Sequence, residues 1–140
     1  MIVYLIRHAS AGKRSKWSGD DRLRPLDERG GRQAHALVAQ LEGRELDRIL
    51  SSPYVRCIQT VEPLARARGL ATEEDGALAE GAGAKAAIAR LESSGDAVAA
   101  CVHGDLLDEL LGREEPKGST TVLEVGSGAP TVLERLPPAA

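Results

Sequence analysis

Two short apolar stretches, at residues 2–6 and 97–102, are each followed directly by polar residues. A shorter one, Ile49-Leu50 within residues 48–51, lies between them and is also followed by polar residues. Short apolar runs of this kind are typical of strands buried in a parallel sheet, where both faces of the strand are covered. The sequence therefore predicts three such strands, each ending in a polar loop.

Helical spacing of apolar residues follows these strands. The helices expected in this way cover residues 27–43, 53–69, 84–94 and 105–111. Asp27 is placed to cap the first helix, Pro53 fits the first position of the second, and Pro63 predicts a kink or break within it. In the second helix the expected inward-facing residues are Val55, Ile58, Val61, Leu64 and Ala65.

The chain closes with a different pattern. Residues 121–125 and 131–135 each begin with Thr-Val-Leu-Glu and flank a segment with two glycines and a proline, which predicts a β-hairpin. Strands that alternate with helices favour an α/β fold. We therefore expect a single domain over residues 1–140, a three-layer α/β/α sandwich with a mostly parallel central sheet and a C-terminal hairpin.

The composition argues against several classes of function. The 140 residues are 42% hydrophobic, lack Phe and carry a net charge of -3, so no basic field for nucleic acid is expected. No apolar stretch approaches the about 20 residues of a membrane helix, and no signal peptide is expected, which predicts a cytoplasmic protein. Cys57 and Cys101 lie in apolar surroundings and are expected to be buried free thiols, with a disulfide as the alternative.

The candidate chemistry lies where strands end. His8 follows the first strand with Arg7 beside it, and His103 follows the third. Ser51 and Ser52 end the second strand, and Arg56 lies in the next helix. Ligands of parallel sheets bind at this edge. A neutral imidazole can attack phosphorus, and a guanidinium offers a planar donor fork to phosphate oxygens.

Two further residues fit the same chemistry. Gly104 allows the backbone close to a ligand, and Glu80, in an irregular segment, could protonate a leaving oxygen. Taken alone, the Arg7-His8 pair and Arg56 each have a commoner structural explanation. The structural alternatives for the others are a buried histidine bonded to a carbonyl at His103 and a solvated loop carboxylate at Glu80, and only for Glu80 does the functional interpretation come first. Lys13, Arg14 and Lys16 belong to a long polar loop that is either solvated or a clamp for additional phosphates.

Together, the motifs Arg-His, Ser-Ser-Pro-x-x-Arg, Leu-x-Glu-Gly and His-Gly resemble the histidine phosphatase superfamily, which has the phosphoglycerate-mutase-like fold. The resemblance extends from residue 2 to about residue 105. It implies that His8 accepts the phosphoryl group and that Glu80 is the candidate proton donor. It also implies a phosphate pocket made by Arg7, Arg56, His103 and Gly104.

Within the superfamily, residues 21–30 are similar to the short branch that includes the phosphohistidine phosphatase SixA. The chain is also similar to the phosphatase domain fused to Nudix hydrolases in actinobacteria, although it contains no Nudix segment. Ala9 replaces the glycine that usually follows the catalytic histidine. The resemblance implies a phosphatase that works without metal or other cofactor, on phosphohistidine proteins or small phosphoesters.

Two alternatives to a phosphatase remain open. One is a mutase that returns the phosphoryl group to its substrate, and the other is a non-catalytic phosphate-binding module. A cysteine-dependent phosphatase is excluded, because neither cysteine has an arginine six positions later. A Walker loop is absent, and the histidines lack metal-ligand spacing. The expected partner is a phosphorylated small molecule or phosphoprotein, and the sequence leaves the oligomeric state open.

Overall fold

The computed structural model describes all 140 residues and contains one six-stranded sheet, in the order β3-β2-β4-β1-β5-β6. The strands are β1 Ile2–Arg7, β2 Arg48–Ser51, β3 Thr72–Glu74, β4 Ala97–Val102, β5 Thr120–Glu124 and β6 Thr131–Leu136. The first four run parallel, and β5 and β6 are antiparallel. The mostly parallel sheet and the closing hairpin are thereby confirmed.

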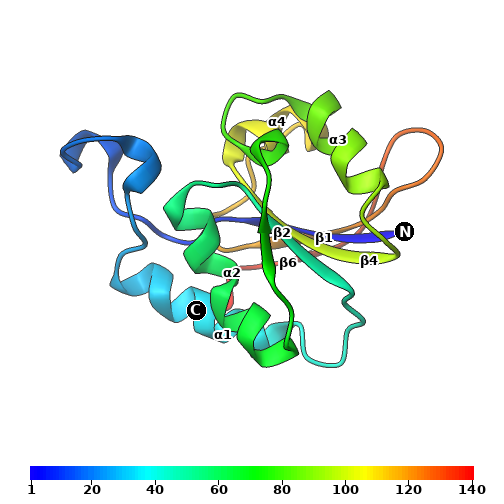
Figure 1. The fold of residues 1–140 in the computed structure, drawn as a ribbon, viewed down its shortest axis with the longest axis horizontal. Helices are drawn as coiled ribbons and strands as arrows, with labels where there is room; N and C mark the ends of the chain where they lie inside the picture. The colour runs from blue at the N-terminus through cyan, green and yellow to red at the C-terminus, as the bar shows by residue number, and fades with distance from the viewer.

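Helices cover both faces of the sheet, as expected for a three-layer sandwich. They are α1 Glu28–Gln40, α2 Val55–Arg68, α3 Ala84–Glu92 and α4 Gly104–Leu111. Figure 1 shows α1 and α2 on one side of the sheet and α3 and α4 on the other. None of these helices is long and apolar enough to cross a membrane.

Each face of the sheet has its own apolar core, and β1 contributes to both. Val3 and Leu5 pack in the core that includes residues of α3 and α4. Tyr4 and Ile6 pack in the core that includes residues of α1 and α2. Successive side chains of a strand point to opposite faces, so a strand covered on both sides must be apolar throughout. This explains the uninterrupted apolar pattern of residues 2–6.

The strand register aligns the ends of the three central strands. Arg7 of β1 pairs with Val102 of β4, and Ser51 of β2 pairs with Cys101 of β4. The residues that follow these strands, His8, His103 and Ser52, therefore lie in one row at the same edge of the sheet. This edge positions the functional residues described below.

The first helix forms largely as predicted. The Asp27 side chain accepts a hydrogen bond from Gly30 N at 2.8 Å and so caps the helix. The helix ends at Gln40, a few residues before Gly43, which has a positive φ of 79° in the turn that follows. Asp27 thus sets the first residue of α1, and Gly43 lies in the turn by which the chain leaves the helix.

The second helix differs from the prediction at its N-terminus. It begins at Val55 rather than at Pro53, and it continues through Pro63 without a break. Its buried face includes Arg56, Cys57 and Thr60, whereas Val55 and Ile58 are only half-buried. The reason is that the first turn lies over the polar strand ends, so that polar residues face inward there.

The two cysteines are free and buried, as predicted. Cys101 lies in β4 and Cys57 in α2, and the Cys57 thiol is 3.5 Å from Nε2 of His103. The thiols therefore belong to the layer directly beneath the row of strand ends.

Two adjacent glycines of α1 provide a test of the packing. A Cβ atom at Gly30 would lie only 1.9 Å from the carbonyl oxygen of Ser10, whereas one at Gly31 would meet nothing within 4 Å. We expect Gly31→Ala to stabilise the protein by about 0.5–1 kcal/mol, because glycine lowers helix stability. We expect Gly30→Ala to destabilise it, because α1 must move away from the loop. Urea denaturation of both variants measures the difference, and equal effects would contradict this packing.

Candidate active site

The two histidines predicted as site residues lie next to each other at the sheet edge. Their ring centroids are 5.5 Å apart. The amide of His8 donates to the Val102 carbonyl at 3.1 Å, and the amide of Ser52 donates to the Cys101 carbonyl at 3.0 Å. These bonds extend the sheet pairing by one residue, so the backbone at both positions is fixed.

His8 is oriented by its own loop. Its Nδ1 is 2.9 Å from the carbonyl oxygen of Ala9 and must donate to it, which leaves the lone pair on Nε2. The pKa of His8 is lowered from 6.5 to about 3, and burial is the largest cause. The hydrogen bond to Ala9 acts in the opposite direction, and the positive charges of His103, Arg56 and Arg7 add to the lowering. His8 is therefore a neutral imidazole with a free nitrogen at neutral pH.

Ala9 fits its position without strain. Its amide donates to Oγ1 of Thr60 at 2.9 Å, and Thr60 in turn donates to the Arg56 carbonyl at 2.7 Å. Glu115 is the only non-glycine residue with a positive φ, so Ala9 has an ordinary backbone conformation. The alanine that replaces the usual glycine is thus compatible with this loop.

The His103 ring is held by contacts with Ser52 and Tyr54. Its Nε2 is 2.8 Å from Oγ of Ser52, and its ring packs edge-on against Tyr54, with centroids 4.6 Å apart. Its Nδ1 is buried without a hydrogen-bond partner. The ring therefore presents one unsatisfied nitrogen on the side opposite Ser52.

Arg7 is held against the first turn of α4. Its Nη1 donates to the carbonyl oxygen of Glu115 at 2.7 Å. A Cβ atom at Gly104 would lie 2.9 Å from Cζ of Arg7, so the guanidinium packs directly on the glycine. The sequence predicted that Gly104 brings the backbone close to a ligand; in the structure the group packed against this glycine is the Arg7 guanidinium. Nε of Arg7 is buried and has no partner.

Arg56 is almost completely buried and is anchored by Asp21. Its Nη1 donates to the Asp21 carbonyl at 2.8 Å, and its Nη2 lies 3.1 Å from the Asp21 carboxylate. Asp21 also pairs with Arg24 and Arg14. Burial would raise the pKa of Asp21, but the contacts with Arg24, Arg56 and Arg14 outweigh burial and lower it. Asp21 therefore remains an anion that fixes three arginines.

Glu80 lies within the same group of side chains. Its carboxylate accepts from Arg14 at 2.8 and 2.9 Å and from Nη2 of Arg56 at 3.1 Å. Its Oε2 is 3.6 Å from Nδ1 of His103. The amide of Gly81, the next residue, donates to Asp105 at 2.7 Å, which ties the segment to α4. The structure therefore brings Glu80 together with His103 and Arg56.

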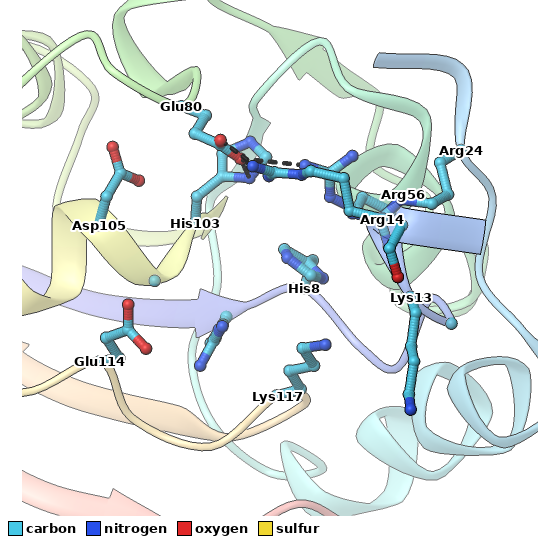
Figure 2. Close-up of a pocket in the computed structure, with 14 residues that line it drawn as sticks. His8, Lys13, Arg14, Arg24, Arg56, Glu80, His103, Asp105, Glu114 and Lys117 are labelled. Carbon is cyan, nitrogen blue, oxygen red and sulfur yellow. Dashed lines mark hydrogen bonds and ion pairs between the residues drawn. The ribbon is translucent and has the colours of Figure 1, made fainter. Parts of the chain in front are cut away.

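All six predicted residues line one cavity of about 530 Å³, and no hydrophobic residue lines it. Figure 2 shows His8 near the centre, with Glu80, His103 and Arg56 on one side and Lys117 on the other. The basic lining residues are Arg7, Lys13, Arg14, Arg24, Arg56 and Lys117. The acidic ones are Glu80, Asp105 and Glu114. The excess of positive charge favours an anionic ligand.

The unsatisfied polar atoms indicate where an anion fits. Five buried side-chain nitrogen or oxygen atoms in the protein lack a partner, and three of them belong to Arg7, Arg56 and His103. Buried polar groups normally form hydrogen bonds, and each exception requires an explanation. All three residues line the cavity, so an oxyanion bound there would lie beside side chains with nitrogens that have no partner in the protein. No cluster of three His, Cys, Asp or Glu side chains that could hold a metal ion is present.

Sequence reasoning left one wall of the cavity open between two interpretations and missed another. The first is the loop before α1, which contributes Gly12, Lys13 and Arg14, while Lys16 does not line the cavity. The second is the segment between α4 and β5, which contributes Glu114 and Lys117. The length and charge of the loop were a usable signal for the first wall. The second wall carries no motif, so only the folded chain shows it.

Comparison with known proteins identifies the family. The model of the histidine phosphatase superfamily (branch 1) matches residues 3–87, which include Arg7, His8, Arg56 and Glu80. The chain belongs to this superfamily. His103 and Gly104 lie outside the matched residues, and their place beside His8 comes from the fold.

Individual relatives agree with this assignment. The 8-oxo-(d)GTP phosphatase of Mycolicibacterium smegmatis is 53% identical over 64 residues, which is 46% of this chain but only 20% of that protein. The protein histidine phosphatase SixA, solved with tungstate, has a TM-score of 0.82 and 24% identity, covering 99% of this chain and 97% of its own. The alpha-ribazole phosphatase of Shigella flexneri has a TM-score of 0.78 and 17% identity, covering 100% and 98%. The phosphoglycerate-mutase-like fold is thereby confirmed.

The depressed pKa of His8 predicts a pH-dependent stability. Between pH 6.5 and about 3 the unfolded chain protonates this histidine and the folded chain does not, so stability falls as the pH decreases through this window. We expect His8 to contribute a loss of about 1 kcal/mol per pH unit below 6.5. His8→Gln should reduce the loss between pH 7 and pH 5.

Urea denaturation at the two pH values measures this loss for each protein. His35→Gln, at an exposed position of α1, is the matched control, since it leaves the buried histidine in place. Equal pH dependence in wild type and His8→Gln would show that His8 is not held neutral by burial.

Proposed function

We propose that the chain is a phosphatase that works through a phosphohistidine intermediate on His8, without a metal ion. The observation that carries the proposal is the free Nε2 of a neutral His8 in a cavity where Arg7, Arg56 and His103 each have a buried nitrogen without a partner. A nucleophile beside preorganised donors is what phosphoryl transfer requires. We also propose that residues 1–140 act as one domain.

In the first step, Nε2 of His8 attacks phosphorus, and the bond from phosphorus to the leaving atom breaks: an oxygen in a phosphoester, a ring nitrogen in a phosphohistidine protein. Arg7, Arg56 and His103 bind the equatorial oxygens, where charge accumulates in the transition state. The guanidiniums supply the positive charge that a metal ion supplies in other phosphatases. Glu80, 3.1 Å from Arg56 and 3.6 Å from His103, is close enough to this position to donate a proton to the leaving oxygen.

In the second step, the Glu80 carboxylate takes a proton from water as the water attacks phosphorus. The bond between phosphorus and Nε2 breaks, inorganic phosphate leaves, and His8 returns to its neutral form. Glu80 must release Arg56 when phosphate enters, because both anions use the same guanidinium. Arg14 retains the carboxylate at the rim through its two hydrogen bonds.

Two substrate classes fit this site, phosphohistidine proteins and small phosphoesters. SixA is a protein histidine phosphatase, and its structure holds tungstate, a tetrahedral oxyanion. The Mycolicibacterium smegmatis relative acts on 8-oxo-(d)GTP, but this chain matches only a fifth of it. Turnover of a phosphohistidine protein and of a panel of small phosphate esters, measured side by side in the presence of a chelator, separates the two classes.

One observation favours a second candidate, a phosphate-binding module without turnover. Glu80 is paired with Arg14 as well as with Arg56, and a carboxylate that stays on Arg14 after phosphate displaces it from Arg56 does not reach the leaving group or water. The site then binds phosphate, or stops at the phosphohistidine, without turnover. Labelling of His8 without continued release of phosphate would favour the module. Return of the phosphoryl group to an organic acceptor would instead indicate a mutase.

Loss of the nucleophile provides the main test. We expect His8→Ala to reduce hydrolysis of p-nitrophenyl phosphate at least about 1000-fold, because the covalent route is removed. The wild type should also form an acid-labile phosphorylated species that the variant lacks. Circular dichroism checks the fold, and His35→Ala is the control. Normal turnover by His8→Ala would reject the mechanism.

Substitution of Glu80 tests the proton donor. An alkoxide leaving group needs a proton, whereas p-nitrophenolate leaves without one. We expect Glu80→Gln to slow hydrolysis of an alkyl phosphate at least about tenfold more than hydrolysis of p-nitrophenyl phosphate. Steady-state kinetics with both substrates measures the ratio. Equal slowing of both would assign Glu80 to binding and leave the donor to another group.

A further inference from the structure

Glu115 occupies a conformation that its residue type disfavours. Its φ is +55°, and it is the only non-glycine residue of the chain with a positive φ. It also precedes Pro116, a position that favours extended backbone. An L side chain in the left-handed region costs about 1–2 kcal/mol, so other interactions must hold this residue in place.

The side chain of Glu115 supplies those interactions. The carboxylate is buried, with only 3% of the side chain exposed, and it pairs with Arg135 of β6 at 2.9 Å and with Arg113 at 3.3 Å. A buried carboxylate is stable only when it is paired, and here each oxygen has its own guanidinium. The two arginines therefore fix the side chain, and the side chain fixes the backbone.

The ion pairs of the Glu115 side chain fix the direction of the Glu115 backbone carbonyl group. The carbonyl oxygen of Glu115 accepts from Nη1 of Arg7 at 2.7 Å. The guanidinium is also in contact with Gly104, which leaves no room for a Cβ atom. This bond uses one N–H of Nη1 and orients the guanidinium. The opposite edge, formed by Nη2 and by Nε, which is buried without a partner, makes no hydrogen bond within the protein. These two form the edge that binds an oxyanion in a bidentate manner.

We propose that Glu115 is a positioning residue for the phosphate site. Its ion pairs with Arg135 and Arg113 hold a strained peptide whose carbonyl aims Arg7 at the substrate phosphate. The inference rests on the proposed role of Arg7 in binding phosphate. The ion pair between Glu115 and Arg135 connects the C-terminal hairpin to the site. Both residues lie outside the 3–87 region matched by the family model.

Substitution of Glu115 should weaken anion binding through Arg7. In Glu115→Ala the peptide can relax to a negative φ, and Arg7 then loses its anchor. We expect the inhibition constant of inorganic phosphate to rise about tenfold, since a hydrogen bond to a charged group is lost. Arg135→Gln should give a smaller rise in the same direction. Glu115→Gly, which tolerates the positive φ, should be less affected than Glu115→Ala.

The matched control removes another ion pair of β6. Glu134 pairs with Arg44 at 2.9 Å, away from the cavity, and Glu134→Gln should leave phosphate binding unchanged. In an Arg7→Gln background, Glu115→Ala should cause no additional loss of phosphate affinity. A residue that only stabilises the fold would lower the melting temperature in both backgrounds and would not depend on Arg7.

A second measurement does not depend on phosphate binding. Nuclear magnetic resonance of the arginine side chains reports rotation of the Arg7 guanidinium, which the bond to Glu115 should slow. We expect faster rotation in Glu115→Ala and no change in Glu134→Gln. Unchanged Arg7 signals in folded Glu115→Ala, or an equal loss of phosphate affinity with and without Arg7, would overturn the proposal. Altered Arg7 signals in a protein that binds no phosphate would instead reject the proposed function and keep the positioning role.

Discussion

The parallel register of β1, β4 and β2 is the constraint on which the site depends. Pairing of Arg7 with Val102 and of Ser51 with Cys101 ends three strands in one row. A strand that slips by one residue turns its side chains to the opposite face, so the apolar cores on both sides of the sheet also fix the row of strand ends. The stability of the cores and the geometry of the site thus have the same origin.

Charge is the second organising feature of the site. Arg56 and Arg7 are held by backbone carbonyls, and only Arg56 also contacts carboxylates, those of Asp21 and Glu80. Carbonyl anchors orient a guanidinium without neutralising it, so positive charge remains for a ligand. The same field, together with burial, keeps His8 uncharged. An imidazole that must act as a nucleophile is therefore surrounded by the cations that bind its target.

Local patterns were sufficient to predict the layers of the fold and most of the site. The apolar runs before His8 and His103 marked buried strands, and Asp27 marked the start of α1. Parallel strands all end on the same side of a sheet, which predicted that Arg7, Arg56 and the two histidines lie at one edge. Glu80 lies in an irregular segment and was predicted from its motif and the family resemblance. Local sequence carries this information because hydrophobic periodicity and capping act within a few residues.

Tertiary structure decided how those residues are held. The inward face of α2, with Arg56 and Cys57 buried, depends on the polar cavity beneath its first turn. The segment between α4 and β5, which contributes Glu114 and Lys117 to the cavity, is tied to β6 by the pair between Glu115 and Arg135, twenty positions apart. Neither feature has a local pattern. Each arises from contacts between distant residues, whose partners become known only when the chain is folded.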